Sequence, residues 1–94
     1  MTAMARSLEV AYRKGKPMAA YLYLNDGSPE RTARSEERDA GLVVDYGGDG
    51  APIGLEITAP KLFSLAALNA VLASIGQPPS TEQEVAPLLR PLAA

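Results

Sequence analysis

The chain has 94 residues, of which 47% are hydrophobic and 21% are charged, and its formal net charge is −2. This composition is typical of one globular domain rather than a disordered segment, and the charge argues against an extended phosphate-binding surface. The absence of Cys and His excludes disulfides, thiolate metal sites, cysteine nucleophiles and Ser-His-Asp catalysis. We therefore expect a single domain over residues 1–94 with a core of Leu, Val, Ile and Ala.

The sequence shows no export or membrane signal. Residues 1–16 lack the apolar run of a signal peptide, because Arg and Lys interrupt them. The longest apolar stretch, residues 65–75, contains Asn69 and Ser74 and is too short to span a bilayer. We expect a cytoplasmic protein with no membrane association.

The first quarter of the chain predicts two strands. Leu8, Val10 and Tyr12 alternate with smaller or polar residues, which is the period-two pattern of a half-buried strand. Gly and Pro break this pattern in residues 13–17, and residues 18–24 resume it. The second strand has two rows, Ala20, Leu22 and Leu24 on one face and Ala19, Tyr21 and Tyr23 on the other. We expect both of its faces to be covered.

A turn and a polar run come next. Asp26-Gly27 marks a turn in residues 25–29, because this pair tolerates the positive φ of tight turns. Residues 31–38 are almost wholly polar, and we expect a short exposed strand over residues 32–37.

The clearest pattern in the chain is a hairpin. Residues 42–46 and 53–58 are β-patterned and flank the turn Gly47-Gly48-Asp49-Gly50. Alternate apolar side chains of the two strands share one face: Leu42, Val44, Tyr46, Ile53, Leu55 and Ile57. Asp45, Glu56 and Thr58 point away from that face.

At Pro60 the apolar period changes from two to about 3.6 residues, which predicts a helix over residues 60–76. Thr58 or Ala59 would cap its start, and Gly76 would end it. Its apolar stripe consists of Leu62, Leu65, Leu68, Leu72 and Ile75. Further apolar side chains widen this stripe beyond the arc that one buried face requires.

Residues 77–94 predict a capping tail. Two pairs have the spacing of a capping box, Ser80 with Gln83 and Thr81 with Glu84. Such a box would open a short helical turn that Pro87 ends, and residues 88–92 would pack on the domain or on a partner. The elements together predict an α+β fold, in which an antiparallel meander of four to five strands (residues 7–58) carries one C-terminal helix on a sheet face.

An ordered set of motifs resembles the small bacterial family called DUF2283. Its elements here are Ala-Ala-Tyr-Leu-Tyr-Leu (residues 19–24), the charged run 31–38, Gly-Leu-Val-Val-Asp-Tyr (41–46), Asp49-Gly50, and Ile-Gly-Leu-Glu-Ile (53–57). The resemblance covers residues 7–60 and implies a compact antiparallel β-sheet domain of unknown function. Members of the family have no established enzymatic activity, and some are suspected toxin–antitoxin components. The acidic approach to the second strand in that family is replaced here by residues 12–17, Tyr-Arg-Lys-Gly-Lys-Pro, which reverse the local charge.

The carboxylates of the hairpin are candidates for a metal site. Asp45, Asp49 and Glu56 form a compact acidic set, with Asp26 near the other turn, and Mg²⁺ and Ca²⁺ prefer such ligands. The spacing nevertheless lacks the terminal Glu of an EF-hand loop. We interpret Asp49 as a turn residue and the other two as outward strand side chains, and we expect no metal and no cofactor. The glycine-rich turn leads into a strand, which argues against a phosphate loop.

Tyr12, Tyr21 and Tyr23 form the strongest candidate binding surface. Basic side chains stand near them in the sequence: Arg13, Lys14 and Lys16. Together they resemble a stacking platform for nucleic acid. The alternative interpretation is that Tyr is a favoured strand residue and that this face packs on the helix or on a second subunit.

The sequence predicts no enzymatic activity, because the hydroxyls of Ser64, Ser74 and Thr81 have no base partner to activate a nucleophile. We expect a non-enzymatic protein–protein interaction module. A nucleic-acid-associated or antitoxin-like regulator is one alternative, and a domain that binds a small ligand between sheet and helix is another.

The broad apolar stripe of the predicted helix also predicts a homodimer. Its expected seam is the helix, through Leu68 and Leu72, together with residues 88–92. The face that carries Tyr21 and Tyr23 is the alternative seam. A protein partner encoded nearby is a further candidate, whereas nucleic acid is a less favoured one.

Overall fold

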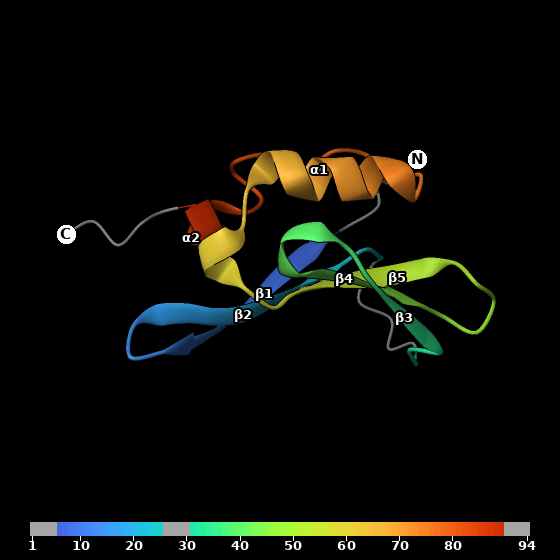
Figure 1. The fold of residues 1–94 in the computed structure, drawn as a ribbon, viewed down its shortest axis with the longest axis horizontal. Coiled ribbons are helices and arrows are strands. Elements are labelled where there is room, and N and C mark those ends of the chain that lie inside the picture. The colour runs from blue at the N-terminus through green and yellow to red at the C-terminus, as the bar shows by residue number, and fades with distance from the viewer. Residues whose placement is uncertain (1–5, 26–30, 90–94) are drawn as a thin grey trace.

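Five antiparallel strands form one sheet, and the helical layer lies on a single face of it (Figure 1). The computed structural model describes residues 6–25 and 31–89. The strands are β1 (Ser7–Arg13), β2 (Lys16–Tyr23), β3 (Arg34–Glu37), β4 (Leu42–Tyr46) and β5 (Pro52–Ile57). The predicted α+β class and antiparallel sheet are therefore confirmed, and the predicted turn at Asp26-Gly27 lies outside the described residues.

The strand order, β1-β2-β5-β4-β3, departs from a simple meander. After β2 the chain crosses to the far edge of the sheet, and β5 fills the place beside β2. Polarity explains this order. In β5, Leu55 and Ile57 align with Leu22 and Ala20 of β2, so that two apolar rows meet in the centre of the sheet. The polar strand β3 has no such row and occupies an edge, where short charged strands are tolerated.

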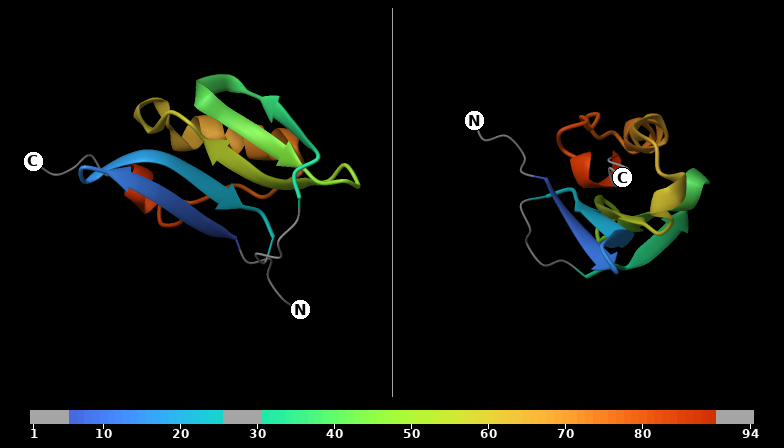
Figure 2. Two further views of the ribbon diagram at one scale, coloured as in Figure 1. Left: turned by 90° about the horizontal axis from the view of Figure 1, so that it is seen from below. Right: turned by 90° about the vertical axis from the view of Figure 1, so that its left-hand side faces the viewer.

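The core lies between the sheet and the helical layer. All six hairpin residues that were predicted to share a face are buried, and they are joined by Ala20 and Leu22 of β2 and by Leu24, which follows this strand. From the helical side come Leu68, Val71, Leu72 and Val85. Figure 2 shows, in its right-hand view, both helices on one side of the sheet. No described element covers the other side.

The predicted helix over residues 60–76 is divided in two. A 3-10 turn, η2 (Pro60–Leu62), comes first, and α1 (Leu65–Ser74) follows it. The division occurs because Phe63 is extended and the Ser64 hydroxyl caps α1, accepting a bond of 3.1 Å from the Ala67 amide. Of the two residues predicted to cap the start, Ala59 is the N-cap residue of η2, whereas the Thr58 hydroxyl donates to the Gly41 carbonyl at 2.9 Å.

The segment after α1 folds back over the core. The Thr81 hydroxyl accepts a bond of 3.2 Å from the Glu84 amide, which confirms half of the second predicted capping box. Pro87 does not end the turn as predicted. It lies in the short helix α2 (Ala86–Leu89), within the first turn, where its missing N–H is not needed. Leu88 packs against the core, as does its neighbour Leu89, while residues 90–92 lie outside the described residues.

The turn between β4 and β5 generates a test of the fold. Gly50 has a φ of +89°, a backbone conformation that residues with a Cβ rarely adopt. Gly48, in the same turn, does not have such a positive φ. We expect Gly50→Val to lower the free energy of unfolding by about 1–2 kcal/mol, because a branched side chain is strained there. Gly48→Val is the matched control and should cost less. Urea unfolding measures both, and equal losses would show that the turn is placed wrongly.

Candidate functional site

The uncovered side of the sheet is an ordered polar surface. On this side, strand register also places Arg13 and its partner Lys16, at the end of the β1–β2 hairpin. We define the open face as the residues that register places here away from that end: Ser7, Glu9, Ala11, Ala19, Tyr21, Tyr23, Ser35, Glu37, Val43, Asp45, Gly54 and Glu56. Among these described positions four are carboxylates and none is Lys or Arg. The left-hand view of Figure 2 looks onto this side, with β1 along one edge and β3 along the other. The open face is therefore acidic.

Tyr21 is the centre of this face. Its hydroxyl donates to Asp45 Oδ2 at 2.9 Å, and the Ser35 hydroxyl donates to Oδ1 of the same carboxylate at 2.7 Å. The ring lies over Gly54, where any Cβ would overlap it. Partial burial and the bond to Asp45 raise the pKa of Tyr21 well above its ordinary value. The side chain is thus fixed across β2, β5 and β4, and its hydroxyl stays protonated.

Tyr23 extends this arrangement towards the edge of the sheet. Its ring meets that of Tyr21 edge to face, with centroids 4.7 Å apart and planes at 62°. Its hydroxyl donates to Glu9 Oε1 at 2.9 Å, and this bond to a carboxylate raises the pKa of Tyr23. These contacts orient the two rings and the carboxylates of Asp45 and Glu9 relative to one another.

Beside Tyr21 the open face is hollowed into a depression of about 380 Å³. Two alanines, Ala11 and Ala19, supply small side chains there, and Tyr21 forms a wall. Glu9 and Glu56 flank it, because register places them on either side of Tyr21. The depression therefore combines an apolar base, an aromatic wall and two carboxylates.

The structure separates the residues that the sequence grouped as an interaction surface. Tyr21 and Tyr23 lie together on the open face, and Tyr12 is 57% exposed in the β1–β2 hairpin. Leu68 and Leu72 were wrongly included. Both have no exposed surface, because they face the sheet and complete the core of a single chain.

The stacking platform considered as an alternative, in which basic side chains lie beside Tyr21 and Tyr23, is not assembled. Arg13 pairs with Lys16 at the end of the hairpin, whereas Tyr21 pairs with Glu9, four residues further along β1. This separation is about 13 Å along a strand. The acidic side chains beside Tyr21 are Asp45 and Glu56, whose carboxylates repel phosphate groups.

The hairpin carboxylates have structural partners. Asp49 accepts a bond of 3.0 Å from the Ala51 amide, which confirms its role in the turn, and Asp45 accepts from the two hydroxyls described above. Within residues 6–25 and 31–89, no three Asp, Glu, His or Cys side chains are placed to hold a metal ion. Asp26 lies outside that part of the chain.

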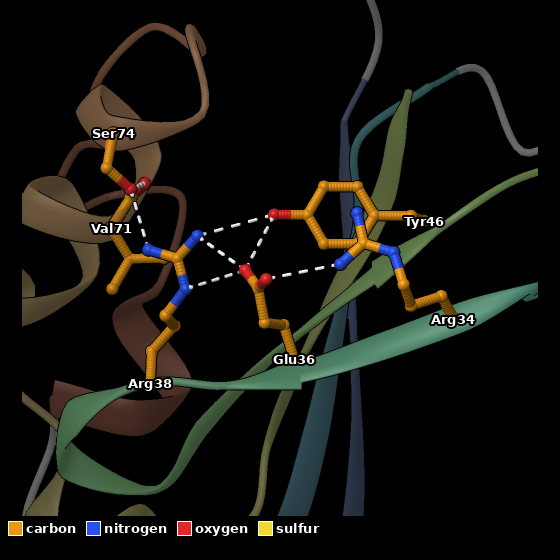
Figure 3. Close-up of polar contacts among 6 residues, drawn as sticks. All are labelled: Arg34, Glu36, Arg38, Tyr46, Val71 and Ser74. Atoms are coloured by element: carbon orange, nitrogen blue, oxygen red, sulfur yellow. Dashed lines mark hydrogen bonds and ion pairs between the residues drawn. The ribbon is translucent and has the colours of Figure 1, made fainter. Parts of the chain in front are cut away.

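A second polar cluster lies where β3 meets α1 (Figure 3). Arg38 donates to Glu36 Oε1 through Nε and Nη2, at 3.3 and 2.9 Å, and to Ser74 Oγ through Nη1 at 2.9 Å. The Tyr46 hydroxyl donates to the same Glu36 oxygen at 3.1 Å, and the Arg34 guanidinium lies 4.1 Å from the Tyr46 ring centre. The bonds from Arg38 and Tyr46 lower the pKa of Glu36. This cluster ties the edge strand to the helix.

A depression of about 550 Å³ lies beside that cluster, at the edge between sheet and helix. It corresponds to the place predicted for a small ligand. Its cation, Arg38, is already bonded to Glu36, and the other charged residues that line it are Glu37 and Asp39. The bonded guanidinium contributes little free positive charge to attract an anion, so the depression offers less to a ligand than the open face does.

Sequence reasoning missed Glu9 and Ser35, which bond Tyr23 and Asp45. Glu9 could have been found from its pairing with Tyr21 in the β1–β2 hairpin. That pairing depends on an irregularity in the register between Ala11 and Tyr12, which the sequence pattern does not predict. Ser35 could be found only by knowing that β3 pairs with β4.

Comparison with family models, with curated proteins and with solved structures finds no significant match. The resemblance to DUF2283 therefore stays a prediction. Among the described helices, none is both long and apolar enough to cross a membrane.

The structural role of the carboxylates has a simple test. We expect added Mg²⁺ or Ca²⁺ to leave the melting temperature unchanged, because Asp45 and Asp49 already accept bonds from protein donors. Asp45→Asn combined with Glu56→Gln should leave the fold intact, as judged by circular dichroism. A saturable stabilisation by either cation that the double variant abolishes would contradict this expectation.

The raised pKa of Tyr21 predicts a dependence of stability on pH. Because the folded chain holds this proton more tightly than the unfolded chain, the stabilisation is complete below about pH 10 and is lost above it. We expect Tyr21→Phe to cost about 0.5–1.5 kcal/mol at pH 8 and to lose less further stability than the parent between pH 8 and pH 11. Urea unfolding at both pH values measures this difference.

Tyr12→Phe is the matched control, because Tyr12 is the more exposed tyrosine. Its stability should fall with pH as that of the parent does. A parallel decline in the parent and in Tyr21→Phe would contradict the bond between Tyr21 and Asp45.

Proposed function

We propose that this protein is a non-enzymatic protein–protein interaction module of the DUF2283 type, which binds a basic side chain of its partner on the open face. The observation that carries this proposal is the depression beside Tyr21, which Glu9 and Glu56 flank. The carboxylates of this part of the sheet favour a cationic partner, because the basic side chains on the same side, Arg13 and Lys16, lie only at the end of the β1–β2 hairpin.

The depression fits the chemistry of a Lys or Arg side chain. Such a side chain has an aliphatic stem and a charged end, and the stem can lie along apolar surface while the end stays solvated. Ala11 and Ala19 supply the apolar surface, and the Tyr21 ring offers a cation–π contact. Glu9 and Glu56 then lie within the same depression as the charged end.

The hydroxyls of Ser64, Ser74 and Thr81 have structural roles, which support a non-enzymatic function. Ser64 and Thr81 accept backbone bonds at the starts of helical turns. Ser74 donates to the Val71 carbonyl at 2.6 Å and accepts from Arg38. None of these hydroxyls has a base among its described partners.

The homodimer predicted from the sequence is retained in this proposal, and so is a cytoplasmic location. A seam through Leu68 and Leu72 is not retained, because both side chains are buried within one chain. An antitoxin-like role remains an alternative that is compatible with protein binding. Nucleic acid is disfavoured because the carboxylates of the open face lie beside its tyrosines.

Binding of a basic peptide tests the proposal. The probe is a dye-labelled peptide of about eight residues with Arg and Lys two positions apart, so that both side chains share one side when it is extended. We expect saturable binding by fluorescence anisotropy that weakens as NaCl is added. Glu56→Gln should weaken it by up to roughly five-fold, because an exposed charge pair contributes about 0.2–1 kcal/mol.

Two controls sharpen this experiment. The same peptide with Gln in place of Arg and Lys should not bind, and Glu37→Gln should bind as the parent does, because Glu37 does not line the depression. Equal binding by parent and Glu56→Gln would sink the proposal. Binding of a single-stranded oligonucleotide in place of the peptide would favour the nucleic-acid alternative.

A further inference from the structure

The outer edge of β1 is the less protected edge of the sheet. Among the described strands β1 pairs only with β2, and it has 7 residues, whereas β3 at the opposite edge has 4, all polar or charged. Short length and charge are the usual protection of sheet edges against pairing with another chain. The edge strand β1 is less protected, because it is longer and its charges, Glu9 and Arg13, have opposite signs. It also offers the half-buried Leu8 and Val10, and Tyr12, which is 57% exposed.

The sequence of β1 is complementary to itself in antiparallel pairing. When two copies of one strand pair about a two-fold axis at Ala11, Glu9 faces Arg13 of the second copy, and Arg13 faces its Glu9. In the same register Val10 faces Tyr12 of the second copy. With the axis at Val10 instead, Glu9 would face Ala11, and no opposite charges would meet. Charge therefore selects one register.

The side chains of these pairs also lie on suitable faces. Alternate residues of a strand share a face, which places Arg13 on the same side of the sheet as Glu9 and Ala11 of the open face, and Val10 and Tyr12 on the other side. The irregularity of the β1–β2 pairing inserts its extra residue, Met18, in β2, so β1 keeps its alternation. Aromatic residues opposite β-branched ones and opposite charges are favourable cross-strand pairs.

The bond from Tyr23 prepares Glu9 for such a contact. The Tyr23 hydroxyl occupies Glu9 Oε1 at 2.9 Å, while no described side chain donates to Oε2. An arginine approaching from the free edge of β1 can bond this second oxygen without displacing Tyr23. The carboxylate is thus already oriented by its own sheet.

We propose that two copies of this chain associate through their β1 edges, antiparallel and centred on Ala11, to form one continuous ten-stranded sheet. Arg13 of the second copy then lies opposite Glu9, beside the depression of the open face. In this dimer the partner of the proposed interaction module is a second copy of the chain. The inference rests on the proposed function in one respect, namely that Glu9 binds a basic side chain.

Charge exchange tests this seam. Light scattering of the parent at micromolar concentration should give about twice the chain mass of 9.9 kDa. Glu9→Arg alone and Arg13→Glu alone should each be monomeric, because like charges then face each other at both ends of the seam. Mixing the two variants should restore the double mass as a heterodimer, and the chain that carries both changes should dimerise with itself.

Glu37→Arg and Lys61→Glu are matched controls, because both residues are exposed and lie outside β1, and both variants should remain dimeric. Tyr12→Lys tests the seam independently of Glu9 and Arg13, because it removes the pair of Tyr12 with Val10 of the second copy. This variant should also be monomeric. Circular dichroism checks that each variant is folded. A monomeric parent, a single variant that stays dimeric, or a mixture that stays monomeric would overturn the proposed seam.

The peptide titration separates this inference from the function on which it draws. Monomeric Arg13→Glu keeps the depression with Glu9 and Glu56, so it should still bind the basic peptide. If the parent is monomeric but binds the peptide, only the proposed β1 seam is contradicted. If the parent forms the charge-dependent dimer but does not bind the peptide, only the proposed peptide binding is contradicted.

Discussion

The structure depends on one constraint: a helix of 10 residues and a short tail can shield only one face of a five-stranded sheet from water. Burial of the apolar rows of β2, β4 and β5 under α1 is the main source of stability, because apolar area removed from water supplies most of the driving force of folding. The opposite face and the β1 edge must then be stabilised by other means, or by another molecule.

On the open face, fixed polar contacts replace a second apolar layer. Tyr21 lies over Gly54 and bonds Asp45, and Tyr23 bonds Glu9. These contacts cross four neighbouring strands, so they shape the depression and set the direction of its carboxylates. The same contacts that hold the sheet thus create its most specific surface. In this protein, structure and proposed function use one set of residues.

Much of the fold followed from local patterns. The alternation in residues 42–46 and 53–57 predicted which side chains are buried. Because alternate side chains of a strand share a face, only one orientation of the hairpin buries its row of apolar side chains. The division of the helix at Phe63 did not follow, since the apolar period continues through it and Ser64 as a cap depends on local backbone geometry. A wide apolar stripe suggested a dimer seam, whereas Leu68 and Leu72 serve the core of one chain.

The candidate site was predicted only in part, because it depends on contacts between distant segments. Tyr21 and Tyr23 were identified from the sequence, but their partners Asp45 and Glu9 are 24 and 14 residues away. Such pairs need the strand order, and that order departs from the simplest arrangement. The acidic character of the face is a property of the whole sheet rather than of any motif.

The most direct test of this account is to map where a basic partner binds. Amide chemical shifts of the isotope-labelled protein, recorded during titration with the Arg- and Lys-containing peptide, report the contact surface residue by residue. The account predicts that the shifts cluster at Ala19, Tyr21 and Glu56, around the depression of the open face. Shifts confined to α1 and the Arg38 cluster, or no shifts at all, would contradict it.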